Sequence, residues 1–244
     1  MRVQIIGCGD AFGSGGRLQT CFRVQSPSAH FLMDCGASAL PALKRCGVDP
    51  ATLDFIVITH FHGDHFGGLP FLLVEERIVR RRESPLCVVG PPGLAERVEQ
   101  ACEILFPGSS PVTRIPSVTF HEYNAAEPLQ VSGAQIQAFP VVHSEGTHPH
   151  AVRVECDGKV VAFSGDTEWT ENLIPAARDA DLFLCEAYFY EKKVPKHLDY
   201  RTLAAHRAEL RCKNLLLTHL HGDMLGRLRE IPEQAAQDGM VLEI

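Results

Sequence analysis

One short apolar run, followed at once by four metal-binding side chains, constrains this chain more than any other feature. The run is Phe55–Ile58, and the next seven residues, Thr59–His65, read THFHGDH. An apolar run of this length predicts a buried β-strand, and the residues just beyond a strand end are held at one point on the sheet edge. Histidine and aspartate together suit a borderline divalent metal such as zinc. The sequence therefore predicts a fold in which a strand end delivers ligands to metal.

The spacing within this cluster favours two metal ions. His60 and His62 are two residues apart and can bind one ion. Asp64 and His65 are adjacent, so they more naturally reach a second. A solvated polar loop is the alternative, but four strong ligands in six residues are better explained by a ligand role.

Strands and helices are predicted to alternate along the chain, which indicates a layered α/β fold. The 244 residues contain no linker or low-complexity tract, so we expect a single domain over residues 1–244. The expected strands are Val3–Ile6, Phe22–Gln25, His30–Met33, Phe55–Ile58, Leu86–Val89, Ile136–Val142, Ala151–Glu155, Val160–Phe163, Leu182–Cys185 and Asn214–Leu217. The expected helices are Ser38–Cys46, Leu69–Arg82, Gly93–Leu105, Trp169–Ala177, Tyr200–Leu210 and Pro232–Gln237.

Further polar side chains occupy the ends of predicted strands. They are Asp34, His143, Asp166, Glu186 and His219. Because rigid strands aim the residues beyond them at a common edge, we expect these five to join the first cluster.

The chain also contains an internal echo. Thr59–Leu69 and Thr218–Leu228 match at seven of eleven positions, and each follows an apolar run. Two similar strand-loop units in the two halves predict approximate internal two-fold symmetry, with the two edges meeting at the metals.

Composition narrows the classes of function. The formal net charge of −7 disfavours broad nucleic-acid binding, which usually requires a basic surplus. Arg77–Arg82 is a local exception, which we interpret as a solvated helix end, with contact to a phosphate-bearing substrate as the alternative.

Hydropathy and cysteine usage indicate the compartment. No apolar stretch reaches about 18 residues, so no membrane span is predicted. The nine cysteines include no C-x-x-C pair, and the N-terminus lacks a signal-peptide pattern. Reduced thiols and a cytoplasmic location are therefore expected.

The predicted charge of the site favours hydrolysis of an anionic substrate. Two divalent ions, Asp64, Asp166 and a bridging hydroxide leave a net charge of about +1, which attracts anions and stabilises charge in the transition state. Water between two ions ionises near neutral pH, so no protein nucleophile is required. The chain has no serine in a G-x-S-x-G elbow.

Taken together, these motifs resemble the metallo-β-lactamase superfamily. The H-x-H-x-D-H motif and the later His143, Asp166 and His219 follow that family's ligand order. The flanking segments are most similar to its ribonuclease Z and phosphodiesterase branch: Ile6–Asp10, Phe31–Gly36, Gly67–Pro70, Val89–Gly93, Phe163–Thr167 and Leu217–His219. The resemblance implies a four-layer αβ/βα sandwich with two zinc ions at one edge; manganese and iron suit the same ligands.

The resemblance also implies roles for individual residues. His60, His62 and His143 would hold the first ion, and Asp166 would bridge. Asp64, His65 and His219 would hold the second ion, with Asp64 also accepting a proton. Asp34 would fix a ligand imidazole from behind. His197 would contact the scissile phosphate, oriented by Glu186.

The chain departs from ribonuclease Z in one respect. Only 23 positions separate His143 from Asp166 (166 minus 143), which leaves no room for the long arm that grips transfer RNA in that family. His221 competes with His219 as a ligand, although the strand-end position favours His219. His148 and His150 are interpreted as surface or structural residues, with substrate contact as the alternative.

The leading hypothesis is a dinuclear metal-dependent phosphodiesterase that uses a metal-bridging hydroxide on a small or cyclic diester. An armless ribonuclease Z-like nuclease is the second. A lactone, thioester or β-lactam hydrolase is the third, and a non-catalytic metal-binding accessory protein is the fourth. By resemblance, we expect a homodimer.

Overall fold

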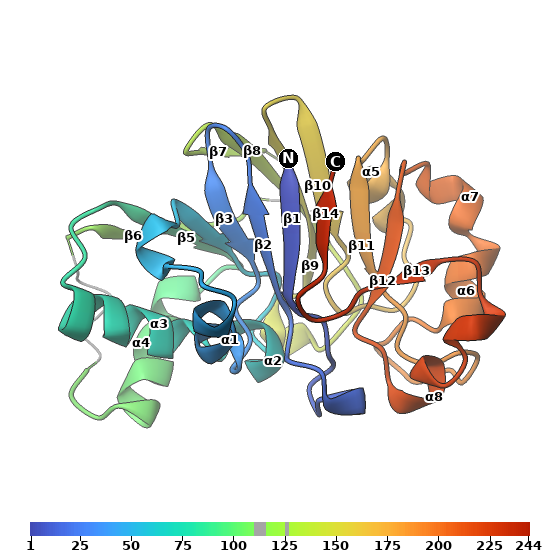
Figure 1. Ribbon diagram of the computed structural model, residues 1–244, viewed down its shortest axis with the longest axis horizontal. Helices are drawn as coiled ribbons and strands as arrows, with labels where there is room; N and C mark the ends of the chain where they lie inside the picture. Colours follow the sequence, from blue (N-terminus) through green and yellow to red (C-terminus); the bar gives the residue numbers. More distant parts are fainter. Residues whose placement is uncertain (110–115, 125–126) are drawn as a thin grey trace.

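Two seven-stranded mixed sheets face each other, and helices cover their outer faces (Figure 1). The computed structural model describes residues 1–109, 116–124 and 127–244. The first sheet has the order β14-β1-β2-β3-β4-β5-β6, formed by Val241–Glu243, Arg2–Gly7, Cys21–Gln25, His30–Met33, Phe55–Val57, Leu86–Gly90 and Val118–Glu122. The second has the order β13-β12-β11-β10-β9-β8-β7, formed by Gln234–Ala235, Leu215–Thr218, Leu182–Glu186, Lys159–Phe163, His150–Cys156, Ala134–Pro140 and Leu129–Val131.

The helices form two outer layers. The described α-helices are α1 (Ala39–Arg45), α2 (Gly63–Phe66), α3 (Leu69–Glu75), α4 (Leu94–Leu105), α5 (Leu173–Ala177), α6 (Tyr200–Ala205), α7 (Arg207–Leu210) and α8 (Gly222–Leu225). In Figure 1, α1, α3 and α4 (blue to green) lie with the first sheet, and α5 to α8 (orange to red) lie with the second. The expected four-layer arrangement is therefore present.

Side-chain alternation along the strands builds three apolar interfaces between these four layers. Phe31 and Met33 point into the core between the sheets, whereas Leu32 between them packs under the first helical layer. Likewise, Leu184 faces the central core and Phe183 faces the second helical layer. Because both faces of these strands are covered, they read in the sequence as continuous apolar runs.

The internal symmetry is visible in the strand order. Each sheet has three antiparallel pairings followed by three parallel ones: β14 to β3 and then β3 to β6 in the first, β7 to β10 and then β10 to β13 in the second. The predicted pseudo-two-fold relation is thus confirmed. By this order β4 corresponds to β11, not to β12. The echoed loops, which follow β4 and β12, are therefore offset by one strand from the symmetry.

Several expected elements differ in the structure. The helix expected at Pro232–Gln237 is wrong: this segment contains β13, which pairs with β12 and completes the second sheet. Contact with a sheet edge outweighed the local helix propensity of glutamine and alanine. The helix expected to start at Trp169 begins only at Leu173, and the one expected over Tyr200–Leu210 is interrupted at His206. The edge strands β6, β7 and β14 were not predicted.

The helix expected over Leu69–Arg82 is also shorter. It is α-helical to Glu75, continues as a π-helical turn and ends at Arg81, whose backbone is left-handed. Arg82 is buried, and its guanidinium donates to Pro50 O (3.0 Å) and Pro85 O (2.9 Å). The interpretation of this segment as a solvated helix end is therefore wrong for Arg82, which has a structural role.

Two further expectations bear on location. In the residues that the structure describes, no helix is long and apolar enough to cross a membrane. All nine cysteines are unpaired, and only Cys46 is exposed.

Candidate metal centre

The first ligand loop joins β4 to the short helix α2. His60 lies just beyond the strand, and His62 has extended backbone and caps the helix that carries Asp64 and His65. A glycine makes this packing feasible: a Cβ at Gly36 would lie 2.3 Å from the carbonyl oxygen of Asp64. As a result, the turn after β3 approaches α2 closely.

The other candidate ligands come from the second sheet. His143 follows β8, Asp166 follows β10 and His219 follows β12. His219 has a left-handed backbone (φ 58°), and its N–H donates to Cys8 O at 3.1 Å. Such conformations are uncommon for non-glycine residues and concentrate at functional sites. The edges of the two sheets thus meet at one cluster, as predicted.

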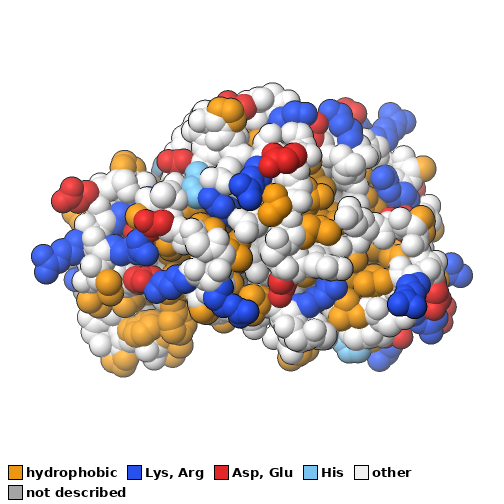
Figure 2. All heavy atoms as spheres, viewed as in Figure 1, with side chains coloured by type: hydrophobic (Ala, Val, Ile, Leu, Met, Phe, Trp, Pro, Cys, Tyr) orange, Lys and Arg blue, Asp and Glu red, His pale blue; other side chains and the backbone are white. Residues whose placement is uncertain are grey.

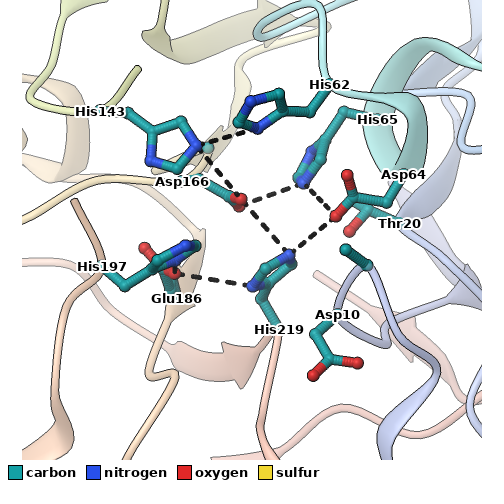
Figure 3. Close-up of polar contacts among 12 residues, drawn as sticks. Asp10, Thr20, His62, Asp64, His65, His143, Asp166, Glu186, His197 and His219 are labelled. Carbon is teal, nitrogen blue, oxygen red and sulfur yellow. Dashed lines mark hydrogen bonds and ion pairs between the residues drawn. The ribbon is translucent and has the colours of Figure 1, made fainter. Parts of the chain in front are cut away.

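The first group of ligand atoms comprises His60, His62, His143 and Asp166, all within 4.8 Å of one another. His143 Nε2 lies 3.0 Å from His62 Nδ1 and 3.9 Å from Asp166 Oδ2 (Figure 3). His60 Nε2 is also 3.9 Å from Asp166 Oδ2. Three imidazoles and a carboxylate converging in this way match the donor set of a tetrahedral zinc ion.

The second group comprises Asp64, His65, His219 and again Asp166. His65 Nε2 lies 3.3 Å from Asp64 Oδ2 and 3.1 Å from Asp166 Oδ1. His219 Nε2 lies 3.1 Å from Asp64 Oδ2 and 3.4 Å from Asp166 Oδ2. Asp166 belongs to both groups, and Figure 3 shows its carboxylate in contact with His143 of the first and with His65 and His219 of the second. One carboxylate can therefore serve two cations.

The buried polar atoms of the cluster fit metal ions. His60 Nε2, His65 Nε2 and Asp166 Oδ1 are buried and make no hydrogen bond in the described part of the chain. Buried polar atoms are almost always hydrogen-bonded, so atoms without a partner require an explanation. All three point into the groups described above, and a cation at each group would complete them. The residues present therefore fit two divalent metals.

The electrostatics of the cluster point the same way. Burial alone would raise the pKa of Asp64 and of Asp166, but the neighbouring imidazoles outweigh it and hold both pKa values well below their usual range. Burial keeps the pKa of His60 low, so its imidazole is neutral and able to bind metal. Against the effect of burial, nearby carboxylates raise the pKa of His65 well above its usual value. A divalent cation would replace that proton as the positive partner of these carboxylates.

Residues behind the ligands fix their orientation. Asp34 Oδ2 accepts a hydrogen bond from His65 Nδ1 at 2.6 Å and from Thr59 Oγ1 at 2.8 Å. His143 Nδ1 donates to Lys196 O at 2.6 Å. Each contact leaves Nε2 of the imidazole facing the cluster, which is the usual arrangement behind metal-bound histidines. The position predicted for Asp34 is thus observed.

A third group shares Asp166 and His219 with the ligand groups and adds Glu186 and His197. Glu186 ends β11, and its Oε1 accepts a short hydrogen bond from His197 Nδ1 and lies 3.5 Å from His219 Nδ1 (Figure 3). Burial lowers the pKa of His197, but its bond to Glu186 outweighs this and raises the pKa above its usual value. The bond to Glu186 therefore favours the protonated form of His197, next to the candidate metal ligands.

Three other histidines lie outside the cluster. His221 Nδ1 accepts a hydrogen bond from Asp223 N (3.1 Å), and its ring packs on Phe189 (4.3 Å). His148 lies on a left-handed turn, and His150 packs beside Tyr123. His219, rather than His221, contributes to the ligand groups.

Sequence reasoning missed three residues that shape the site. Thr59 links Asp34 to His60 Nδ1, and Lys196 supplies a backbone oxygen to His143. Tyr188 packs against His197, with ring centroids 4.5 Å apart. A backbone oxygen leaves no mark in a sequence, but Thr59 adjoins the motif and Tyr188 follows Glu186 by two positions.

Comparison with known proteins identifies the family. A family model described as a β-lactamase superfamily domain matches residues 29–220. The chain belongs to the metallo-β-lactamase superfamily. Within it, the relatives place this metallo-β-lactamase-fold hydrolase in the ribonuclease Z and phosphodiesterase branch.

The similarity to individual relatives extends over most of the chain. A ribonuclease Z of Mycobacterium bovis (strain BCG) is 28% identical over 190 residues, which are 74% of this chain and 68% of that protein. The short form of human tRNase Z superposes with a TM-score of 0.79 at 22% identity and covers 100% of this chain and 99% of that one. A diphosphatase from the PhnP family superposes at 0.77 with 22% identity, covering 100% and 97%. The two solved structures confirm the fold.

Proposed function

We propose that this protein is a dinuclear metal-dependent phosphodiesterase. The observation that carries the proposal is the sharing of Asp166 by two ligand groups, next to the His197–Glu186 pair. A two-cation site flanked by a fixed imidazolium suits a reaction in which a phosphoryl centre gains negative charge.

The chain's own residues define the two positions. His60, His62 and His143 would hold the first ion, Asp64, His65 and His219 would hold the second, and Asp166, which belongs to both groups, would serve both. The nitrogen and oxygen donors favour zinc and also accept manganese or iron. When bound, such a pair of divalent ions lowers the pKa of water and stabilises charge on phosphoryl oxygens.

The remaining groups handle protons and charge. His65 and His219 hold the pKa of Asp64 low against the effect of burial, which keeps it ionised. As the carboxylate beside the second ion group, it would accept the proton of the attacking water. His197 places its protonated Nε2 toward the phosphoryl oxygens, where it stabilises the pentacoordinate centre. Glu186 fixes the imidazole plane and maintains its charge.

The substrate class follows from what the fold provides. The 22 residues between His143 and Asp166 form a 3-10 turn, β9, β10 and their short connections, with no arm. The structure therefore favours a small or cyclic diester over transfer RNA. An armless ribonuclease Z-like nuclease is the second candidate, because the curated relatives include ribonuclease Z.

Assembly and location complete the proposal. Phe71 on α3 and Ile104 and Leu105 on α4 are exposed apolar side chains. Figure 2 shows hydrophobic side chains gathered at the lower left, where these helices lie in Figure 1. Such a surface favours association with a second copy, so we infer a homodimer. Unpaired, mostly buried cysteines favour the cytoplasm. Sedimentation velocity of the wild type and of Ile104→Lys tests the dimer: a monomeric wild type contradicts it.

The test of the reaction compares substrates on metal-quantified protein. We expect hydrolysis of bis-p-nitrophenyl phosphate that requires the metals, and no cleavage of precursor transfer RNA. Activity only on nitrocefin or a lactone would favour an acyl hydrolase, and silence with every substrate would favour a non-catalytic accessory protein. Cleavage of the transfer RNA would favour the nuclease.

His197→Ala tests the assigned roles separately. Its turnover should fall roughly 100- to 1,000-fold, because one stabilising charge is removed from the transition state. The metal content should stay at two ions per chain. Loss of metal from this variant would make His197 a ligand and contradict the assignment.

A further inference from the structure

One atom of the proposed reaction has no partner among the residues assigned above. The two cation positions and the His197 imidazole account for the phosphoryl oxygens, and Asp64 accounts for the proton of the attacking water. The oxygen of the departing alcohol or phenol also gains negative charge as its bond to phosphorus breaks. A hydrogen-bond donor directed at that oxygen would stabilise the transition state.

Most hydroxyl groups next to the candidate ligands already donate hydrogen bonds within the protein. Tyr188 is the exception, because its hydroxyl makes no hydrogen bond in the described part of the chain. The committed donors are Thr20 (to Gly9 O, 3.4 Å), Thr59 (to Asp34 Oδ2, 2.8 Å), Ser164 (to Gly165 O, 2.7 Å), Thr167 (to Glu168 O, 2.7 Å) and Thr218 (to Cys8 O, 3.3 Å).

The Tyr188 ring lies against imidazoles of the candidate site. Tyr188 follows Glu186, the last residue of β11, by two positions. Its ring centroid is 4.5 Å from that of His197, with the planes 30° apart, and 5.7 Å from that of His219. His197 also lines a cavity with Trp169 in its wall, but Tyr188 does not, so the phenol meets the imidazole outside that cavity. The phenol therefore adjoins both the imidazole proposed to contact the phosphoryl group and a candidate ligand of the second ion.

Two backbone hydrogen bonds fix Tyr188 in this position. Its N–H donates to Leu198 O at 2.8 Å, and its carbonyl oxygen accepts from His221 N at 2.9 Å. Leu198 follows His197 directly, and His221 follows His219 by two positions. The residue is thus tied to both loops whose imidazoles it touches. A donor that is held in place before the reaction needs no reorganisation when charge develops.

The hydroxyl of Tyr188 is close to the acidic groups of the site. Burial raises the pKa of Tyr188, and the carboxylates of Asp10, Glu186 and Asp166 add to this effect. Figure 3 shows these three carboxylates around the His219 imidazole. The side chain is only partly buried, so a bound ligand can reach it. The phenol is therefore directed at the candidate metal centre and is accessible there.

We propose that the Tyr188 hydroxyl donates a hydrogen bond to the leaving oxygen of the diester at the metal centre. The oxygen of the attacking water forms the new bond to phosphorus. The electron pair of the broken bond stays on the leaving oxygen, where the Tyr188 donor stabilises it until a proton arrives from solvent. A tyrosine is a neutral donor near pH 7, since its ordinary pKa is about 10. The inference deepens the proposed function and rests on it, because it adds a residue to the same reaction.

The test compares two leaving groups on metal-loaded enzyme. Methyl p-nitrophenyl phosphate releases p-nitrophenolate, which is stable without a donor, whereas methyl phenyl phosphate releases a more basic phenolate. Tyr188→Phe keeps the ring against His197 and removes only the hydroxyl. Its turnover should fall roughly 100-fold with methyl phenyl phosphate but less than about threefold with methyl p-nitrophenyl phosphate. A purely structural role would not make the loss depend on the leaving group.

Tyr190→Phe is the matched control. The Tyr190 ring stacks on Tyr200, with centroids 5.5 Å apart, and Tyr190 belongs to none of the ligand groups. Turnover of this variant should match the wild type with both substrates. The metal content and the thermal unfolding midpoint of Tyr188→Phe should also match the wild type. Loss of metal from Tyr188→Phe, equal losses with both substrates, or unchanged turnover with both would overturn the proposal.

The two proposals fail in different ways. If the wild type hydrolyses neither diester, the reaction is overturned, and the role of Tyr188 with it. If the wild type hydrolyses both and Tyr188→Phe loses the same factor with each, the reaction stands and only the role of Tyr188 is overturned.

Discussion

The loops Thr59–Leu69 and Thr218–Leu228 share sequence and local shape, yet only the first supplies four candidate ligands. In each, a histidine with extended backbone precedes a four-residue helix that ends at a glycine: His62 before α2 and His221 before α8. The backbone angles at the two glycines, Gly67 and Gly226, agree within a few degrees. The difference in ligand supply therefore does not come from the short helices, although the loops differ before them: His219 has a left-handed backbone and its counterpart His60 does not.

Position in the sheets separates the two loops. His65 is enclosed by Asp34, Asp64 and Asp166, whereas its counterpart Met224 is buried in the apolar layer outside the second sheet. Asp64 faces the metal groups, whereas its counterpart Asp223 accepts a hydrogen bond from Tyr190 N. The same short-helix conformation can therefore present metal ligands in one loop and pack its helix in an apolar layer in the other, depending on which strand the loop follows.

The largest expected difference is between Asp64 and Asp223, the aspartates at corresponding positions in the two loops. Asp64→Asn should lower diesterase activity by roughly 1,000-fold or more, because it removes both a charged ligand and the proton acceptor. Asp223→Asn should change activity less than about twofold, since its partners are the Tyr190 amide and the Arg227 side chain, neither of which belongs to the ligand groups. Steady-state kinetics with metal analysis measures both. Similar losses in the two variants would break the comparison.

Met224→Ala tests the residue of the second loop that corresponds to His65 in the first. The free energy of unfolding should fall by about 2–5 kcal/mol, because a fully buried side chain leaves a cavity in the helical layer. Metal content should stay unchanged. Denaturant unfolding and elemental analysis test this. A loss of metal without a loss of stability would mean that Met224 itself supports the metal centre.

Asp34→Asn tests the hydrogen bond that orients His65, which has no equivalent at its counterpart Met224. Metal affinity or activity should fall about 10- to 100-fold, because the carboxylate that orients His65 is replaced by a weaker acceptor. Competition with a zinc chelator provides the measurement. Unchanged affinity would show that packing alone orients the imidazole.

A smaller effect is expected at Asp181, which lies at the end of β11 opposite to Glu186 and the candidate metal centre. Asp181 precedes β11, and although burial opposes it, bonds from Lys213 and Val160 N lower its pKa from 3.8 to about 2. A carboxyl with a lowered folded pKa stabilises the fold above its unfolded pKa, and this contribution disappears as the pH falls from about 4 to about 2. Allowing for solvent screening around the exposed lysines, Asp181→Asn should cost about 1–2 kcal/mol at pH 7.

Asp181→Asn should not affect the metal centre, so the metal content of the variant serves as an internal control. Thermal unfolding at pH 7 and at pH 2.5 should show the difference between Asp181→Asn and the wild type shrinking at the lower pH. Metal content at pH 7 should not change. A difference that persists undiminished at pH 2.5 would contradict the assigned role of the carboxylate.

The local motifs predicted much of this structure, and the failures share a cause. Phe55–Ile58 and the ligands after it were predictable because strand, turn and helix there follow from adjacent residues. The edge strands β13 and β14 were not, because two or three residues become a strand only when a sheet edge is already present to pair with them. Arg82 was misinterpreted for a related reason, since two of the carbonyl groups that bind its guanidinium, those of Pro50 and Leu53, lie 32 and 29 residues away in the sequence.

By itself, the sequence determined the layered fold, the branch of the family and the seven side chains that converge on the metal edge, since ligand type and strand-end position are local properties. Only the tertiary structure decided the distances among these side chains, that the backbone oxygen of Lys196 lies behind His143, and that a cavity with Trp169 adjoins His197. Those outcomes depend on distances between residues far apart in the chain, and such distances are set by how the two sheets pack.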